Sequence, residues 1–298
     1  MDYNAFLWDC KMAADQGISK IRPDSPVLTQ IRGMSTVETR HCMNNLNRYG
    51  ANYLEVGSFC GSTFVSSLVG HNKKGWSIDN YSEFTGPEYA PGTDGTHRDE
   101  LLYNINTYLN CPTQYFQEDS FQFDPDKLEA PVDVFMYDGD HDQDKQRRAL
   151  EHYYDSLNDV VLFIVDDWNS QAVRDGTYEG IRNTEMCILG EISIRTPHNS
   201  HPQYWSGLYA AFLAKECPAD RFLQTSLSSG NCNFAHPIKD SRACDNVLRF
   251  MQPENGKSEE EIKKILAANF PQLMGSQINE AVDEGKRLYA QQETRGKF

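Results

Sequence analysis

Short strand-like runs alternate with helical segments through the middle of the chain, and this alternation constrains the fold more than any other sequence feature. Each apolar run is followed by a polar turn and then by a segment with helical spacing. Strands joined through helices in this way lie parallel in one sheet, with helices on both faces. The predicted fold class is therefore α/β, a Rossmann-like, doubly wound and mostly parallel sheet. Ligands of such sheets bind at the carboxyl ends of the strands.

The spacing of apolar residues places the individual elements. Strands are predicted at 53–57, 76–79, 114–117, 132–137 and 160–165. Helices are predicted at 35–49, 62–69, 98–109 and 143–157, after an N-terminal helical region broken at 22–26. Beyond residue 167 the pattern loosens: 205–215 is predicted to be helical, and 222–227 and 231–235 to be closing strands. Ser35 with Glu38, and Ser258 with Glu261, have the spacing of a capping box.

Three regions follow from this pattern. Residues 1–44 are expected to form a helical cap or lid, residues 45–240 the ligand-binding α/β domain, and residues 241–298 a helical C-terminal extension. The acceptor is expected to be selected by the loops 80–96 and 169–201, because loops carry most of the specificity in folds of this class.

The charge of the chain limits its partners. It carries 43 acidic and 28 basic residues, a formal charge of −15, which repels phosphate backbones and anionic lipid. A small molecule is therefore the expected partner, rather than nucleic acid or a membrane, and a homo-oligomer stays possible. The N-terminal residues do not resemble a secretory signal, so a cytoplasmic location with reduced cysteines is expected.

A glycine turn follows the first strand of the domain, in the sequence Glu55-Val56-Gly57-Ser58-Phe59-Cys60-Gly61. Glycines allow a sharp turn and a close approach of a ligand to the backbone. The spacing E-x-G-x-x-x-G differs from the G-x-G-x-x-G of a dinucleotide site. Two acids strengthen the prediction of a nucleoside site. Asp79 ends the second strand, where a carboxylate reaches ribose hydroxyls, and Asp119 follows the third, where it could accept from an adenine amine.

The stretch 32–167 resembles the class I methyltransferases that use S-adenosylmethionine, in their metal-dependent O-methyltransferase branch. Asp138-Gly139-Asp140-His141 followed by Asp166-Asp167-Trp168 is similar to the group that contains macrocin O-methyltransferase and related sugar O-methyltransferases. Met34-Ser35-Thr36 is similar to the family segment that folds over the donor. The resemblance implies S-adenosylmethionine as cofactor, bound by Met34, Ser35, Glu55, Gly57, Ser58, Gly61, Ser62, Asp79, Asp119, Ser120 and Asp138.

Three aspartates are the predicted metal ligands. Asp138 ends the fourth strand, Asp166 ends the fifth, and Asp167 follows directly. Neighbouring strand ends would bring these carboxylates together, where they would repel one another unless a cation lay between them. An all-oxygen set suits magnesium, manganese or calcium. The alternative is that these acids only cap the following helices.

The implied reaction is O-methylation of a small molecule with neighbouring hydroxyls, such as a sugar or a catechol-like diol. His141 and Asp140 are the candidate bases, because both follow a predicted metal ligand on the same turn. His141 could instead orient a carboxylate, and Asn169 could complete the coordination. Tyr204, Trp205 and Tyr209 are expected to pack in the core rather than line an acceptor site.

Three other functions stay open. Asp138-Gly139-Asp140 is also a D-x-D sequence, which metal-dependent nucleotide-sugar glycosyltransferases use to bind a diphosphate. A metal-dependent oxygenase-like relative could share this fold, as the cephalosporin hydroxylase group does. The chain could also be a non-catalytic protein that only binds S-adenosylmethionine.

Overall fold

The structure of the protein, a computed structural model, describes residues 1–82, 97–216, 258–269 and 282. The chain divides into two units, Met1–Pro218 and Ala219–Phe298. The second unit contains helix α10 (Glu259–Asn269), which begins with the predicted capping box. The amide and hydroxyl of Ser258 both donate to Glu261 Oε2 over 2.8 Å, and the amide of Glu261 donates to Ser258 Oγ.

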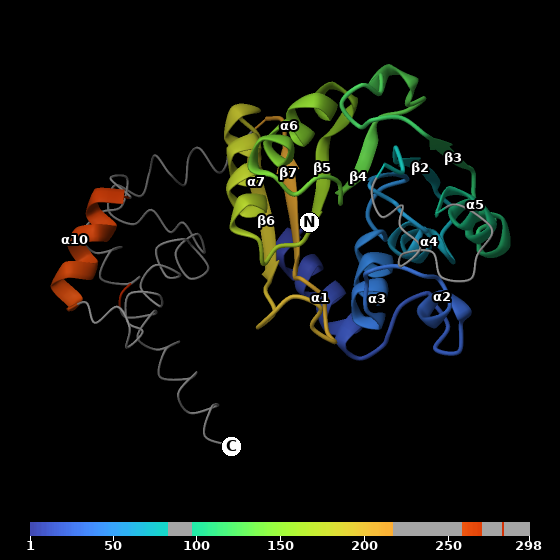
Figure 1. The fold of residues 1–298 in the computed structure, drawn as a ribbon, viewed down its shortest axis with the longest axis horizontal. Helices are drawn as coiled ribbons and strands as arrows, with labels where there is room; N and C mark the ends of the chain where they lie inside the picture. Colours follow the sequence, from blue (N-terminus) through green and yellow to red (C-terminus); the bar gives the residue numbers. More distant parts are fainter. Residues whose placement is uncertain (83–96, 217–257, 270–281, 283–298) are drawn as a thin grey trace. The chain divides into compact units, whose positions relative to one another are not determined.

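Seven strands form one sheet in the first unit, in the order β3-β2-β1-β4-β5-β7-β6 (Figure 1). The strands are β1 (Asn52–Val56), β2 (Lys74–Ile78), β3 (Thr113–Phe116), β4 (Val132–Tyr137), β5 (Leu157–Asp166), β6 (Cys187–Ile194) and β7 (Leu208–Ala214). The first five strands are parallel, whereas β7 runs antiparallel to both β5 and β6. The predicted Rossmann-like, mostly parallel α/β sheet is therefore confirmed.

Helices cover both faces of this sheet. They are α1 (Tyr3–Asp15), α2 (Pro26–Thr29), α3 (Val37–Leu46), α4 (Ser62–Leu68), α5 (His97–Tyr108), α6 (Gln143–Tyr153) and α7 (Gln171–Asn183), with 3₁₀ turns η1 (Pro125–Lys127) and η2 (Tyr154–Ser156). Side chains alternate between the two faces along each strand. Tyr53 of β1 accordingly joins the core under α1, α3, α4 and α5, and its neighbour Leu54 joins the core under α6 and α7.

Two predictions beyond residue 167 are wrong. The segment predicted as a helix at 205–215 contains strand β7, because its fully buried residues pair with β5 on one side and β6 on the other. Tertiary pairing overrides the helical preference of its alanines there. The segment 169–201, expected to be a variable loop, contains helix α7 and strand β6. The predicted strands at 222–227 and 231–235 lie outside the described residues.

Two smaller expectations also change. Thr36, rather than Ser35, caps α3, since its side chain accepts from the Thr39 amide over 3.1 Å. Cys187 is disulfide-bonded, so the expectation that every thiol is reduced does not hold, although Cys10, Cys42, Cys60 and Cys111 are free. Within the described ranges, the structure contains no helix both long and apolar enough to cross a membrane.

Helix α1 is part of the core of the first unit. Its residues Leu7 and Cys10 are fully buried among residues of the sheet, and the rings of Tyr3 and Phe6 pack against Phe212 of β7 at 4.7 and 5.6 Å. A separate lid over residues 1–44 remains a prediction, but this first helix covers one face of the sheet.

We expect Leu7→Ala to lower the free energy of unfolding by about 2–5 kcal/mol, because it removes a buried side chain and leaves a cavity. Trp8→Ala changes the adjacent, 53% exposed residue and should cost less than about 1 kcal/mol. Urea unfolding of both variants measures the difference. Equal costs would mean that α1 does not pack on the sheet as described.

Candidate functional site

One cavity of about 340 Å³ lies at the carboxyl ends of β1, β2, β4 and β5. The predicted catalytic and metal-binding residues all line it, as does every predicted donor-site residue except Glu55 and Gly61. The predicted residues that line it are Met34, Ser35, Gly57, Ser58, Ser62, Asp79, Asp119, Ser120, Asp138, Asp140, His141, Asp166 and Asp167. Topology therefore brings together residues that are more than 130 positions apart in the sequence (167 − 34 = 133).

The glycine turn is shaped by close packing between two strand ends. Gly57 has a φ of +86°, and a Cβ at this position would lie 1.9 Å from the carbonyl oxygen of Asp138. Only glycine fits such a site without moving the backbone. Gly61 faces away from the cavity, because a Cβ there would meet Leu101 of α5 at 2.6 Å. Gly61 allows the start of α4 to pack against α5. The sequence pattern alone could not distinguish this packing role from a role in ligand binding.

Glu55 lies beneath the turn rather than in the cavity. Its side chain is fully buried, with one carboxyl oxygen bound by the Tyr53 hydroxyl and the other by Thr63 Oγ1 at 2.8 Å. Burial raises the pKa of Glu55 from 4.5 to about 7, although these hydrogen bonds act in the opposite direction. The residue therefore holds β1 to α4.

Asp79 ties the glycine turn to the end of β2. Its Oδ2 accepts from the Phe59 amide over 2.9 Å and its Oδ1 from the Tyr81 amide over 2.7 Å. Burial raises the pKa of Asp79, and these two backbone hydrogen bonds oppose the rise. Each carboxylate oxygen keeps a second lone pair for a ligand.

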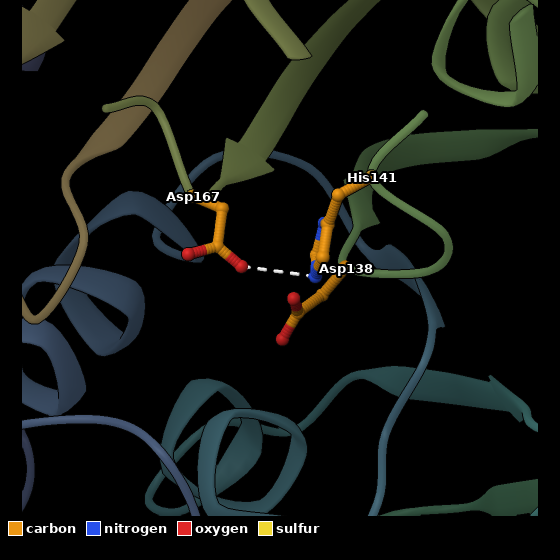
Figure 2. A group of neighbouring side chains, drawn as sticks. All are labelled: Asp138, His141 and Asp167. Carbon is orange, nitrogen blue, oxygen red and sulfur yellow. Dashed lines mark ion pairs between the residues drawn. The ribbon is translucent and has the colours of Figure 1, made fainter. Parts of the chain in front are cut away.

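Three side chains form an acidic cluster at the tips of β4 and β5, namely Asp138, His141 and Asp167 (Figure 2). One possible ligand atom from each lies within 4.8 Å of those of the other two. His141 Nε2 and Asp167 Oδ2 are 2.9 Å apart. Asp166 lines the same cavity but does not belong to this group. It is the last residue of β5, whereas Asp167 has a φ of +50° and therefore departs from the direction of the strand.

The charges of this cluster are only partly compensated. Burial, followed by repulsion from Asp166 and Asp167, raises the pKa of Asp138 well above its usual range. Burial and the charge of Asp167 raise the pKa of Asp166 to about 7. Burial acts to raise the pKa of Asp167 as well, but the hydrogen bond and charge of His141, together with a hydrogen bond to Ser206, outweigh burial and lower it. Such a set favours a positive group between the carboxylates.

Asp140 and His141 differ in their surroundings. Asp140 forms an ion pair with Lys145 and accepts a hydrogen bond from the Asp142 amide over 3.0 Å. Burial acts to raise the pKa of Asp140, but its interactions with Lys145 and Asp142 outweigh burial, so that the pKa is lowered. A carboxylate held in this way is a poor proton acceptor. Burial acts to lower the pKa of His141, but the hydrogen bond with Asp167 and the surrounding acids raise it.

The suggested coordination by Asn169 finds no support in the structure. Its amide oxygen accepts from the Thr196 amide over 3.0 Å, and Asn169 does not line the cavity. Trp205, expected in the core, does line the cavity. Tyr204 and Tyr209 are buried as expected, the latter stacked on Trp168 at 4.1 Å.

The sequence pattern missed other residues of the cavity wall. His97 is buried, with its ring 4.3 Å from that of Phe59, and Lys145 reaches the wall from α6. No motif contains His97 or Lys145, and each belongs to the wall only because α5 and α6 begin beside the strand ends. The only sequence signal for these two residues is that each follows an acid at the end of a strand, at the start of the next helix.

No family model matches the chain, and no curated protein does. Solved structures with partly similar folds include an O-methyltransferase from Streptomyces achromogenes in complex with S-adenosylmethionine, at 12% identity and a TM-score of 0.43 over 71% of this chain and 90% of that one. A Bacillus cereus O-methyltransferase in complex with S-adenosylhomocysteine has 13% identity and a TM-score of 0.41, over 70% and 91%. The precorrin-8W decarboxylase of Methanobacterium thermoautotrophicum has the same identity and TM-score, over 62% and 94%. Matches this distant decide neither the ligand nor the reaction of this chain.

We expect Glu55→Gln to change how stability depends on pH. Since the folded-state pKa of this acid is raised from 4.5 to about 7, the folded protein binds more protons than the unfolded chain between these values. The parent should therefore lose up to about 3 kcal/mol of stability from Glu55 as the pH rises through this window. In Glu55→Gln this loss is absent.

Chemical unfolding at several pH values between 4.5 and 8 measures the difference between variant and parent, which should grow as the pH rises. Glu129→Gln is the control, because this exposed acid pairs with Lys74 and its pKa is lowered. If the difference in unfolding free energy between Glu55→Gln and the parent stayed constant across this pH range, the raised pKa of the buried Glu55 would be contradicted.

Proposed function

We propose that the protein is an S-adenosylmethionine-dependent methyltransferase that methylates a hydroxyl of a small molecule with the help of a divalent cation. The observation that carries this proposal is the single cavity in which the glycine turn and Asp79 lie beside the acidic cluster. A volume of about 340 Å³ suits a ligand of this class. Acidic walls also suit a donor that carries a positive sulfonium.

The residues fit a donor with a nucleoside end and an amino-acid end. Asp79 would accept from ribose hydroxyls. Asp119, whose Oδ1 already accepts from the Phe121 amide, would accept from the base. The close packing of Gly57 against Asp138 supports this arrangement, because a donor bound at the glycine turn would have its middle next to the cluster.

Asp138 and Asp167 would hold the cation, since a hard divalent ion is commonly bound by one or two carboxylates together with water and substrate. Once bound, such an ion orients neighbouring hydroxyls and lowers the pKa of one. The protein itself aligns the acceptor oxygen with the methyl carbon, so that the C–O bond forms as the C–S bond breaks. The hydroxyl proton would pass to the second ring nitrogen of His141, because Nε2 of His141 is engaged by Asp167 and Asp140 is engaged by Lys145.

The test combines calorimetry with methylation assays on a panel of vicinal diols. S-adenosylhomocysteine should bind to the parent in the presence of a chelator, while turnover should require magnesium or manganese. Asp138→Ala and Asp167→Ala should abolish metal-dependent turnover with donor affinity changed only a few-fold. His141→Ala should retain the metal but lose about 10²–10⁴ in rate.

Asp144→Ala is the matched control, because this exposed acid on α6 pairs with Arg147 and does not line the cavity. It should behave as the parent. Binding of a nucleotide sugar in place of S-adenosylhomocysteine would instead favour the glycosyltransferase alternative. Full turnover in excess chelator would rule out the metal, and a cation lost in His141→Ala would make His141 a ligand rather than the base.

A further inference from the structure

Arg40 of α3 is a buried cation without an acidic partner. It is 4% exposed, and no carboxylate among the described residues forms an ion pair with it. Its guanidinium donates from Nη1 to the carbonyl of Val27 and from Nη2 to that of Ile31, both over 2.8 Å. Burial lowers the pKa of Arg40 to about 10, so it stays charged at neutral pH. A buried charge without a counter-charge is costly, which calls for a reason to retain it.

The remaining contact of Arg40 leads to the cavity. Its Nε donates to Ser35 Oγ over 3.1 Å, and Ser35 Oγ donates to Ser62 Oγ over 2.9 Å. Both serines line the cavity. Arginine can only donate, so Ser35 must accept from it and pass its own proton onward. No described residue accepts the proton of Ser62, which is therefore left for a ligand.

The direction of this chain of hydrogen bonds selects the kind of ligand group. A chain that begins at a cation polarises each following hydroxyl as a donor. The serine wall, formed by Ser35 and Ser62, thus offers one polarised donor, the Ser62 hydroxyl, backed by a positive charge, whereas Asp138 and Asp167 line the same cavity with negative charge. A zwitterionic amino-acid group, with its carboxylate at the serine wall, matches this separation of charge.

We propose that Arg40 is a positioning residue that, through Ser35 and Ser62, binds the carboxylate of the amino-acid end of the ligand. This inference rests on the proposed function, since S-adenosylmethionine is the ligand that carries such a group. Arg40 itself does not line the cavity, so its effect on the ligand passes through the serines and through its charge.

The test compares two ligands that differ at the amino-acid end. S-adenosylhomocysteine has the carboxylate, and 5′-deoxy-5′-methylthioadenosine does not. By calorimetry, Arg40→Met should weaken S-adenosylhomocysteine about 10- to 50-fold, from the loss of a unit charge in a partly desolvated site. The same variant should change methylthioadenosine binding less than about 3-fold on this reasoning. Arg40→Lys, which keeps the charge, should restore most of the preference.

Two serine variants complete the experiment. Ser35→Ala breaks the chain at its centre and should also lower the preference for the carboxylated ligand. Ser66→Ala is the matched control: it lies one turn along α4, donates to the Ser62 carbonyl over 2.6 Å, and should leave the preference unchanged. If Arg40→Met does not fold, Arg40→Lys and Ser35→Ala carry the test.

Equal losses for both ligands would overturn the inference, since Arg40 would then only hold the 27–35 segment in place. Unchanged affinities in Arg40→Met and Ser35→Ala would overturn it as well. A parent protein that binds neither ligand would contradict the proposed function, and with it the ligand assigned to the serine wall. A parent that binds both ligands, with variants that do not discriminate between them, would contradict the role of Arg40 alone.

Discussion

The contact between the ends of β1 and β4 is the constraint on which the rest of the site depends. The Asp138 amide donates to the Val56 carbonyl over 2.9 Å, and Gly57, the first residue after β1, passes within contact distance of the Asp138 carbonyl. This packing leaves no room for a side chain at position 57. It joins the turn that follows β1 to Asp138, the first acid of the acidic cluster. A donor bound at the turn and a cation bound at the cluster would therefore be neighbours, whatever the acceptor is.

Groups of opposite charge influence the same cavity. The tips of β4 and β5 bring Asp138, Asp166 and Asp167 together, where burial and mutual repulsion favour a cation. The charge of Arg40 reaches the cavity only through the hydroxyls of Ser35 and Ser62. A ligand with a positive centre and a carboxylate complements both groups at once. The same separation explains how a chain with a formal charge of −15 could still bind a carboxylate.

Much of the site could be predicted from the sequence, because the carboxyl ends of parallel strands share one edge of the sheet. This rule was enough to bring Asp79, Asp138 and Asp167 to one cavity. It did not say which way a side chain points. Glu55 and Gly61 belong to the same motif as Gly57, yet they face the core and α5, since strand alternation and helix packing decide their direction. Strand β7 was missed because the neutral, alanine-containing run 208–214 becomes a strand only when it is inserted between β5 and β6.

Arg40 shows another limit of the sequence. It lies in an ordinary helix with polar neighbours, and nothing in the pattern indicates that it is buried or that no carboxylate of the described residues pairs with it. The pairing of His141 with Asp167 was equally hidden, since it depends on the positive φ that turns Asp167 away from β5. Both features arise from tertiary geometry, and both change the chemistry assigned to the cavity.

The central claim is that donor and cation occupy neighbouring positions in this one cavity. A crystal structure of the full chain with S-adenosylhomocysteine and manganese, recorded at a wavelength where manganese scatters anomalously, tests it most directly. The account predicts the nucleoside against Asp79 and a single anomalous peak in contact with Asp138 and Asp167. A nucleoside bound elsewhere, or an acidic cluster without an anomalous peak beside a bound nucleoside, would contradict it.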